Sequence, residues 1–471
     1  MSSFNSKSTS KALFKNTGII AIGQISTKII SFLLLPLYTA LLTTEDYGIL
    51  DLLSTYATLI AVFVGLQLNQ ALFRFLVTSR NDIQKAKMIC STVWLATISM
   101  CVIYALIFCC VQPFIDLSFK WFLLLQVIST IYLQVISGMV RGLGNNTLYA
   151  VGNFISATVT LILNVVILVI LHLGVSEMLL SYIIGPLIGG TVLFFAGKLY
   201  HYISIKNIST DELKRIIKYA VPLVPNELSW SLIHSSDRMI ISAILSVAAN
   251  GLIAVASKFS YVYTTAFSIF NTAWTEQVVL HYKDKGGQEY ICKMFEKMIL
   301  LFGSFSIGII ACMPFVFEIL VDKQYSDAYG LVPFYMIAVF FNAVIGMISA
   351  IYLVENETKQ VAVSTSAAAV VNIVVDLALI KFIGIYAAPI SSICGYASIS
   401  IWRLIDVNRR HCKVSMEIKK LFILFSMLVV SMLGYYINSL PLEIASLLYV
   451  IVIALLINRE FLKELKTIVI K

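Results

Sequence analysis

Apolar stretches long enough to cross a lipid bilayer recur along the whole chain, and they restrict the fold more than any motif does. A membrane-spanning helix needs about 20 consecutive apolar residues. Charge-free stretches of that order include 52–73, 88–115, 121–140 and 328–354. Only 13% of the 471 residues are charged, whereas soluble domains average about 25%. The sequence therefore predicts an all-α polytopic membrane protein.

The apolar stretches predict about fourteen transmembrane helices. Tight connections within 360–402 and between the last two stretches leave twelve as the alternative count. The predicted spans are 17–42, 49–75, 88–112, 119–140, 147–171, 176–197, 216–245, 249–275, 294–320, 330–354, 360–381, 384–402, 420–438 and 441–458.

Basic residues are distributed asymmetrically between the predicted connections. Alternate connections, counted from the N-terminus, hold 28 of the 34 Lys and Arg residues, and the opposite ones hold only Lys120, Lys323 and Lys381. Because cytoplasmic loops are enriched in Lys and Arg, both termini are predicted to be cytoplasmic. The net charge of +9 then indicates attraction to anionic membrane lipids rather than to nucleic acid. No cleavable signal peptide is predicted before residue 17.

The two halves of the chain resemble each other weakly. Six spans per repeat would give two parallel lobes in a MATE-like arrangement, with a substrate cavity expected between them. The matching positions are Gly48 and Gly251, Asn164 and Asn372, and Gly185 and Gly395. The predicted organisation is a cytoplasmic tail at 1–16, an N-lobe at 17–205, a C-lobe at 206–405, and two further helices with a cytoplasmic tail at 406–471.

Three cations, Lys28, Arg238 and Lys258, lie within predicted spans. A charge at the bilayer centre costs about 2.5–3.5 kcal/mol on insertion scales, so each is a candidate functional residue. Gln24 shares a helical face with Lys28, which favours a role in lining the cavity. Arg238 either lines the cavity or forms an ion pair; its candidate partners are Asp237, Glu227 and Asp376.

Polar residues follow one face of the predicted span 249–275. Tyr261, Ser268 and Asn271 recur at helical spacing beside Lys258. Such a stripe either lines a water-filled cavity or holds membrane helices together through hydrogen bonds. Its length and the adjacent lysine favour the cavity.

Further charged residues have two open interpretations each. Arg74 and Arg141 lie at inner helix ends, where they either set topology or bind substrate. Asp376 lies one helical turn after Asn372, so it either contributes to an ion-coupling site or pairs with Arg238.

No catalytic motif, nucleotide-binding loop or zinc-spaced cluster occurs. We therefore expect no enzyme activity, no cofactor and no metal centre, with a gradient of H⁺ or Na⁺ as a candidate drive.

The chain resembles polysaccharide flippases of the Wzx type, within the multidrug/oligosaccharidyl-lipid/polysaccharide exporter superfamily. The resemblance rests on the segments 16–56, 229–246, 251–263 and 324–338. It implies transfer of an undecaprenyl-diphosphate-linked oligosaccharide, such as an O-antigen unit, to the periplasmic leaflet of the bacterial inner membrane. It also implies a polysaccharide polymerase and a chain-length regulator as partners.

Two other functions on the same fold are alternatives. A flippase for the lipid-linked peptidoglycan precursor would also bind a diphosphate. A multidrug/cation antiporter would be expected to carry buried acids, but the first span carries Lys28. A membrane glycosyltransferase is disfavoured because every predicted outer loop is about ten residues or shorter.

Overall fold

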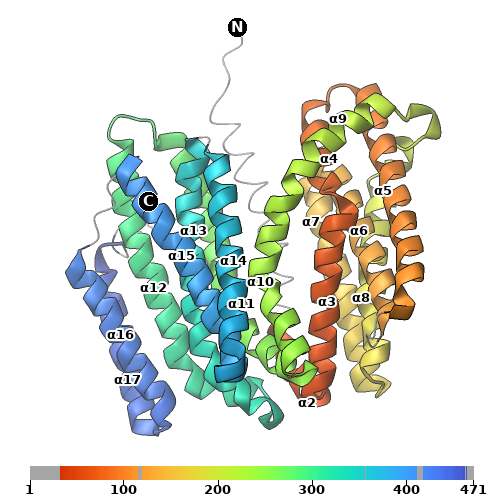
Figure 1. Ribbon diagram of the computed structural model, residues 1–471. Helices are drawn as coiled ribbons and strands as arrows, with labels where there is room; N and C mark the ends of the chain where they lie inside the picture. The colour runs from red at the N-terminus through yellow and green to blue at the C-terminus, as the bar shows by residue number, and fades with distance from the viewer. Residues whose placement is uncertain (1–31, 115–118, 356, 411–416, 462, 464–471) are drawn as a thin grey trace. The chain divides into compact units, whose positions relative to one another are not determined.

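The computed structural model describes residues 32–114, 119–355, 357–410, 417–461 and 463 (Figure 1). Regular structure in these ranges is helical throughout, and they contain no β-strand. The all-α fold predicted from the apolar stretches is confirmed. Gln24, Lys28 and most of the predicted span 17–42 lie outside the described residues.

The chain divides into two compact units, and the first includes Glu45–Leu232. Its helices are α3 (Thr44–Gly65), α4 (Leu68–Thr78), α5 (Ile83–Val111), η1 (Gln112–Phe114), α6 (Lys120–Gly142), α7 (Asn146–Val165), η2 (Val166–Ile170), α8 (Val175–Ala196), η3 (Leu199–His201), η4 (Ile205–Asn207), α9 (Thr210–Ala220) and η5 (Val221–Leu223). The start of α10 (Val224–Ile244) also belongs to this unit.

The second unit takes in Leu35–Thr44 and Ile233–Lys471. It contains α2 (Leu35–Leu41), the rest of α10, α11 (Val247–His281), α12 (Gly287–Leu320), η6 (Lys323–Leu331), α13 (Val332–Val354), α14 (Thr358–Ile383), η7 (Gly384–Tyr386), α15 (Ala387–Arg410), α16 (Ile418–Ile437) and α17 (Leu440–Ile457). The units divide within α10, whereas the predicted lobe boundary lies at 205/206. The predicted repeat limits stay a prediction.

Eleven helical stretches in the described ranges are long and apolar enough to cross a membrane, and one of them, Lys359–Arg410, comprises both α14 and α15. Helices cover every predicted span after the first. α10 is not among the eleven stretches, because Glu227, Asp237 and Arg238 place three charged residues within its 21 residues. The count of fourteen stays a prediction.

The predicted single span 49–75 is wrong, because two helices occupy it. Leu66 and Gln67 have φ angles of 47° and 54°, a left-handed conformation that interrupts a right-handed helix. The Gln67 side chain is buried and accepts a hydrogen bond from Gln70 Nε2 at 2.9 Å. The break therefore starts α4 inside the first unit.

One helix pair in each unit is joined by a hydrogen bond between an asparagine and a serine. On α7 and α8, Asn164 Oδ1 accepts a hydrogen bond from the Ser181 hydroxyl. On α14 and α15, Asn372 Nδ2 donates to the Ser391 hydroxyl at 3.3 Å. Asn164 and Asn372 are among the positions that the weak repeat aligns. The two pairs thus share a buried polar contact within similar surroundings.

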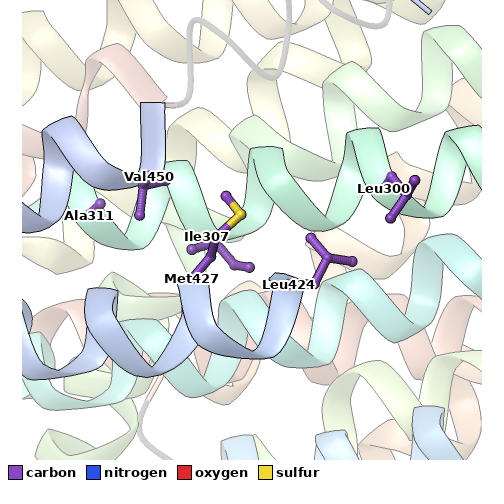
Figure 2. Packing of buried hydrophobic residues seen from close by; sticks show 6 residues of the cluster. All are labelled: Leu300, Ile307, Ala311, Leu424, Met427 and Val450. Atoms are coloured by element: carbon purple, nitrogen blue, oxygen red, sulfur yellow. The ribbon is translucent and has the colours of Figure 1, made fainter. Parts of the chain in front are cut away.

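The last two helices pack on α12. Leu300, Ile307 and Ala311 of α12 form a buried cluster with Leu424 and Met427 of α16 and Val450 of α17 (Figure 2). Figure 2 shows these side chains meeting along the facing sides of the helices. Apolar contacts therefore hold this terminal pair within the second unit.

Two glycines bring α6 close to α4. A Cβ atom on Gly138 would lie 3.2 Å from the backbone oxygen of Asn69, and one on Gly142 would lie 2.8 Å from Leu76 Cβ. Gly138 and Gly142 are four residues apart, so both lie on the same helical face. The absence of side chains on this face lets the two helices pack backbone to backbone.

We expect Gly142→Ala to destabilise the first unit by about 1–3 kcal/mol, since the added methyl group meets the fully buried Leu76. Gly308→Ala on α12 is the control, because a Cβ atom there has nothing within 4 Å. Unfolding temperatures of the purified proteins in detergent test this expectation. Equal unfolding temperatures for Gly142→Ala and Gly308→Ala would contradict the expectation.

Candidate functional site

A pocket of about 950 Å³ with cationic and polar lining residues lies in the first unit. It is formed by α4 and α6, with contributions from α7, α8 and α9. Two of its lining residues, Arg74 and Arg141, are cationic, and several carry amides or hydroxyls. These polar residues are Asn69, Gln70, Thr78, Thr130, Gln134, Ser137, Asn153 and Tyr149. The structure therefore brings together the two arginines that the sequence places at the ends of separate helices.

The backbone around the end of α6 explains the position of Arg141. Arg80 donates from Nε to the Gly142 carbonyl oxygen at 2.8 Å and from Nη2 to the Arg141 carbonyl oxygen at 3.2 Å. A cation at this end also complements the helix dipole. Gly144 then turns the chain with a φ angle of 102°, and the Asn145 side chain accepts a hydrogen bond from Leu148 N at 3.0 Å, which starts α7.

Aromatic rings support both pocket arginines. The Arg74 guanidinium carbon lies 4.3 Å from the centre of the Tyr219 ring. That of Arg141 lies 4.4 Å from the Phe73 ring and 5.6 Å from the Tyr149 ring. A guanidinium stacked on a ring keeps its N–H groups at the edge, where they can donate to oxygen.

The positive charge of the pocket is not neutralised locally. Neither Arg74 nor Arg141 forms an ion pair with any described carboxylate, and no acidic residue lines the pocket. Two arginines of this kind can bind a phosphate or diphosphate bidentately. The neighbouring amides and hydroxyls can exchange hydrogen bonds with the hydroxyl groups of a sugar.

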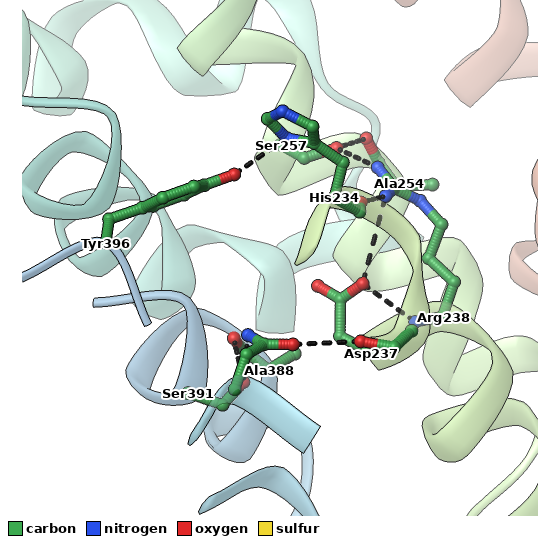
Figure 3. Close-up of polar contacts among 10 residues, drawn as sticks. His234, Asp237, Arg238, Ala254, Ser257, Ala388, Ser391 and Tyr396 are labelled. Carbon is green, nitrogen blue, oxygen red and sulfur yellow. Dashed lines mark hydrogen bonds and ion pairs between the residues drawn. The ribbon is translucent and has the colours of Figure 1, made fainter. Parts of the chain in front are cut away.

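Arg238 lies in a polar network of the second unit (Figure 3). Its Nη1 donates to the His234 carbonyl oxygen at 2.6 Å, and its Nη2 donates to the Ser257 hydroxyl at 3.2 Å. Asp237 Oδ1 lies 3.9 Å from Arg238 Nη1. The Tyr396 hydroxyl points at the His234 ring, 2.7 Å from Nδ1. Arg238 thus joins α10 to α11 and pairs with one of its predicted partners, Asp237.

A second buried polar group, here called the acidic cluster, surrounds Asp376 in the same unit. Asp376 is fully buried, and neither of its carboxylate oxygens has a hydrogen-bond partner among the described residues. Asn372, one turn earlier, accepts from the Ser236 hydroxyl at 2.8 Å and donates to Ser391. Asp237, 3% exposed, completes the cluster. Carboxylate, amide and hydroxyl oxygens are the ligands that hard cations take.

The remaining predicted site residues are spread along α10 and α11. Lys258 is half-buried, with its ammonium 5.1 Å from the centre of the Tyr261 ring. Ser268 is exposed, and the Asn271 amide oxygen is buried without a partner in the part of the chain that the structure describes. Glu227 is half-buried in the portion of α10 that belongs to the first unit.

Sequence reasoning did not single out the rings that hold the arginines. Phe73, Tyr149 and Tyr219 come from α4, α7 and α9, and no spacing rule connects them. The local sequence Phe73-Arg74-Phe75 could have indicated a contact between Arg74 and aromatic rings, because an arginine that only sets topology needs no aromatic neighbours. Asn153 and Gln134 were also not identified, since single amides in apolar helices are usually packing residues.

The architecture defines a multi-pass membrane protein with the fold of transporters. The lipid II flippase MurJ, in an inward closed conformation, has a similar structure: the TM-score is 0.74 at 14% sequence identity, over 95% of this chain and 99% of that one. An inward-facing multidrug resistance MATE family transporter of the MOP superfamily gives a TM-score of 0.68 at 14% identity, over 83% and 98% of the two chains. At this identity the likeness shows the fold alone.

The model of the family described as "Polysaccharide biosynthesis protein" matches residues 13–275, more than half of the chain. The chain therefore belongs to this family. No curated protein sequence matches it. The resemblance to polysaccharide flippases is confirmed at the level of family and MATE-like fold.

We expect Arg238→Met to lower the stability of the second unit by about 1.5–3 kcal/mol, because hydrogen bonds from a charged group are lost inside the unit. Arg409→Met, at an exposed position of α15, is the control. Unfolding temperatures in detergent and surface-polysaccharide levels are measured together. Unchanged stability with lost polysaccharide would instead assign Arg238 to substrate.

Proposed function

We propose that the protein is a flippase for an oligosaccharide linked to a lipid diphosphate. It would move this substrate, an O-antigen or related surface-polysaccharide unit, from the cytoplasmic to the periplasmic leaflet of the bacterial inner membrane by alternating access. The observation that carries the proposal is the pair of ring-supported arginines in the pocket of the first unit, whose charges no described acid balances.

The charge of the pocket suits a diphosphate. Two phosphate groups present several oxygens to two guanidinium groups, and each guanidinium can engage an oxygen pair. Arg141 is only partly exposed, so its contacts with an anion are screened less by water than those of the exposed Arg74. A cationic drug would meet repulsion from Arg74 and Arg141, so the pocket disfavours the multidrug antiporter alternative.

The remaining lining suits sugar. Asn153 donates to the Tyr149 carbonyl oxygen at 2.8 Å and to the Ser137 hydroxyl at 3.3 Å, which holds its amide at the pocket wall. Gln134 and Gln70 add further amides, and Tyr149 adds an aromatic face. Hydroxyl-rich ligands are recognised by such donor and acceptor groups.

The pocket lies where the substrate would be taken up. Arg74 is near the end of α4 and Arg141 near the end of α6, and both ends are cytoplasmic in the predicted orientation. A lipid-linked unit assembled on the cytoplasmic leaflet would meet these charges first.

We expect Arg74→Ala and Arg141→Ala each to weaken binding of the lipid-linked unit at least tenfold, since about 1.5–3 kcal/mol of charge-assisted hydrogen bonding is lost. Binding is measured in nanodiscs, with the unit purified from a strain lacking the gene. The same variants should fail to restore surface polysaccharide in that strain and should accumulate the unit on the inner leaflet.

Lys206→Ala is the control, because Lys206 is exposed and does not line the pocket. Wild-type binding by both arginine variants would contradict the proposal. If the protein is instead a flippase for the peptidoglycan precursor, it should rescue a strain depleted of that flippase. Rescue of this strain without restored surface polysaccharide would favour the peptidoglycan-precursor function.

We propose in addition that the acidic cluster binds the coupling cation, Na⁺ or H⁺. The support is chemical: Asp376 is a fully buried carboxylate without a hydrogen-bond partner among the described residues, and an isolated charge of this kind is strongly disfavoured. Either a bound cation or a proton would compensate it. Asp237, Asn372 and Ser391 offer further oxygens around it.

We expect Na⁺ to raise the unfolding temperature of the wild-type protein, because a ligand that binds the native state stabilises it. Asp376→Asn should abolish this increase, whereas the exposed Asp284→Asn should retain it. An unfolding temperature that responds to pH but not to Na⁺ would identify the proton as the ion. No response to either would contradict the coupling proposal.

A further inference from the structure

We propose that Tyr219 of α9 is a positioning residue that holds the Arg74 guanidinium for the anion, so that α9 forms part of the binding site. This inference rests on the proposed function, because it assigns a role within the same pocket. α9 covers the start of the predicted span 216–245, and none of its residues was among the predicted site residues.

The contact itself is direct. The Arg74 guanidinium carbon lies 4.3 Å from the centre of the Tyr219 ring, and Tyr219 lines the pocket. Arg74 is otherwise exposed and makes no ion pair with any carboxylate in the described ranges. A long side chain without such a support would sample many rotamers and lose that freedom on binding. The Tyr219 ring therefore selects one orientation before the anion arrives.

α9 is itself fixed firmly enough to act as a support. Ile216 and Ala220 are fully buried, and α9 packs against α4 and α5 (Figure 1). At its start, Ser209 N donates to the Thr92 hydroxyl of α5 at 3.1 Å, and the Ser209 hydroxyl accepts from Glu212 N at 3.3 Å. Tyr219 is thus presented from a helix that is hydrogen-bonded to α5 at its start and buried against its neighbours near its end.

A second contact between an arginine and an aromatic ring lies beside the Arg74–Tyr219 contact but outside the pocket. The Arg215 guanidinium carbon lies 4.6 Å from the centre of the Phe75 ring, and the Phe75 and Tyr219 rings meet edge to face at 5.8 Å. Arg215 also pairs with Glu212 at 3.1 Å. Neither Phe75 nor Arg215 lines the pocket. The chain therefore supplies a control for a cation–ring contact that joins α4 to α9 without lining the pocket, and leucine at position 75 keeps an apolar side chain beside the Tyr219 ring.

The test measures binding of geranyl diphosphate to the purified full-length protein in nanodiscs. Tyr219→Leu, Tyr219→Phe and Phe75→Leu are each made in the wild-type and in the Arg74→Ala background. We expect Tyr219→Leu to weaken binding about fivefold, the upper end for a cation–ring contact at an exposed site, and Tyr219→Phe to bind within about twofold of wild type. Phe75→Leu should leave binding unchanged.

In the Arg74→Ala background, Tyr219→Leu should cause no further loss, because the ring acts through the arginine. Unfolding temperatures confirm that each variant is folded, and Tyr219→Gln replaces Tyr219→Leu if the latter does not fold. The inference is overturned if Tyr219→Leu binds as wild type, if Tyr219→Phe loses as much as Tyr219→Leu, or if Phe75→Leu loses as much as Tyr219→Leu. It is also overturned if the losses in binding free energy caused by Arg74→Ala and by Tyr219→Leu are additive in the double variant.

These outcomes separate the inference from the proposed function. Weak binding by Arg74→Ala together with normal binding by Tyr219→Leu rejects only the role of Tyr219. Normal binding by Arg74→Ala rejects the anion pocket itself, and the positioning role with it.

Discussion

A guanidinium on an apolar helix, whether buried or at the helix end, is held by its neighbours, and the kind of support decides which of its donors stay available. Arg403 is 1% exposed and donates to the Ser349, Ser364 and Thr365 hydroxyls and to the Val361 carbonyl oxygen. Its donors are largely used within the unit, so it can hold α13, α14 and α15 together but has little capacity for a ligand. Arg74 and Arg141 rest on ring faces instead, and their donors remain available. The supports therefore separate an arginine whose donors are used within the unit from arginines whose donors stay available.

The sequence predicted the helices well, because each must satisfy its own backbone within the bilayer and so needs a long apolar stretch. It did not predict the break at Leu66 and Gln67, although Gly65 directly precedes it, because a single glycine also occurs inside continuous membrane helices. Arg403, counted among the residues that set topology, is buried. Asp237 was correctly named among the partners of Arg238, since the two are adjacent. Which rings support Arg74 and Arg141 depends on tertiary contacts between α4, α6, α7 and α9, and no periodicity within one helix encodes them.

The weak sequence repeat corresponds to an Asn–Ser contact that occurs in both units, but the residue one turn later differs. The Asn164–Ser181 and Asn372–Ser391 contacts recur in the two units, but the residue one turn after each asparagine differs. In the second unit it is Asp376, and in the first it is the buried Leu168. The same helix pair thus carries a carboxylate in one unit and an apolar side chain in the other.

The close packing of α4 and α6 at Gly138 and Gly142 has a consequence for selectivity. Gly138 approaches the α4 backbone at Asn69, and Gly142 leaves room for the Leu76 side chain, so the two helices fit closely and have little room to slide. Arg74 and Arg141 are therefore carried by helices that move together. For the proposed diphosphate substrate, two adjacent anionic groups would meet two cations on one rigid support, whatever sugars the lipid carries.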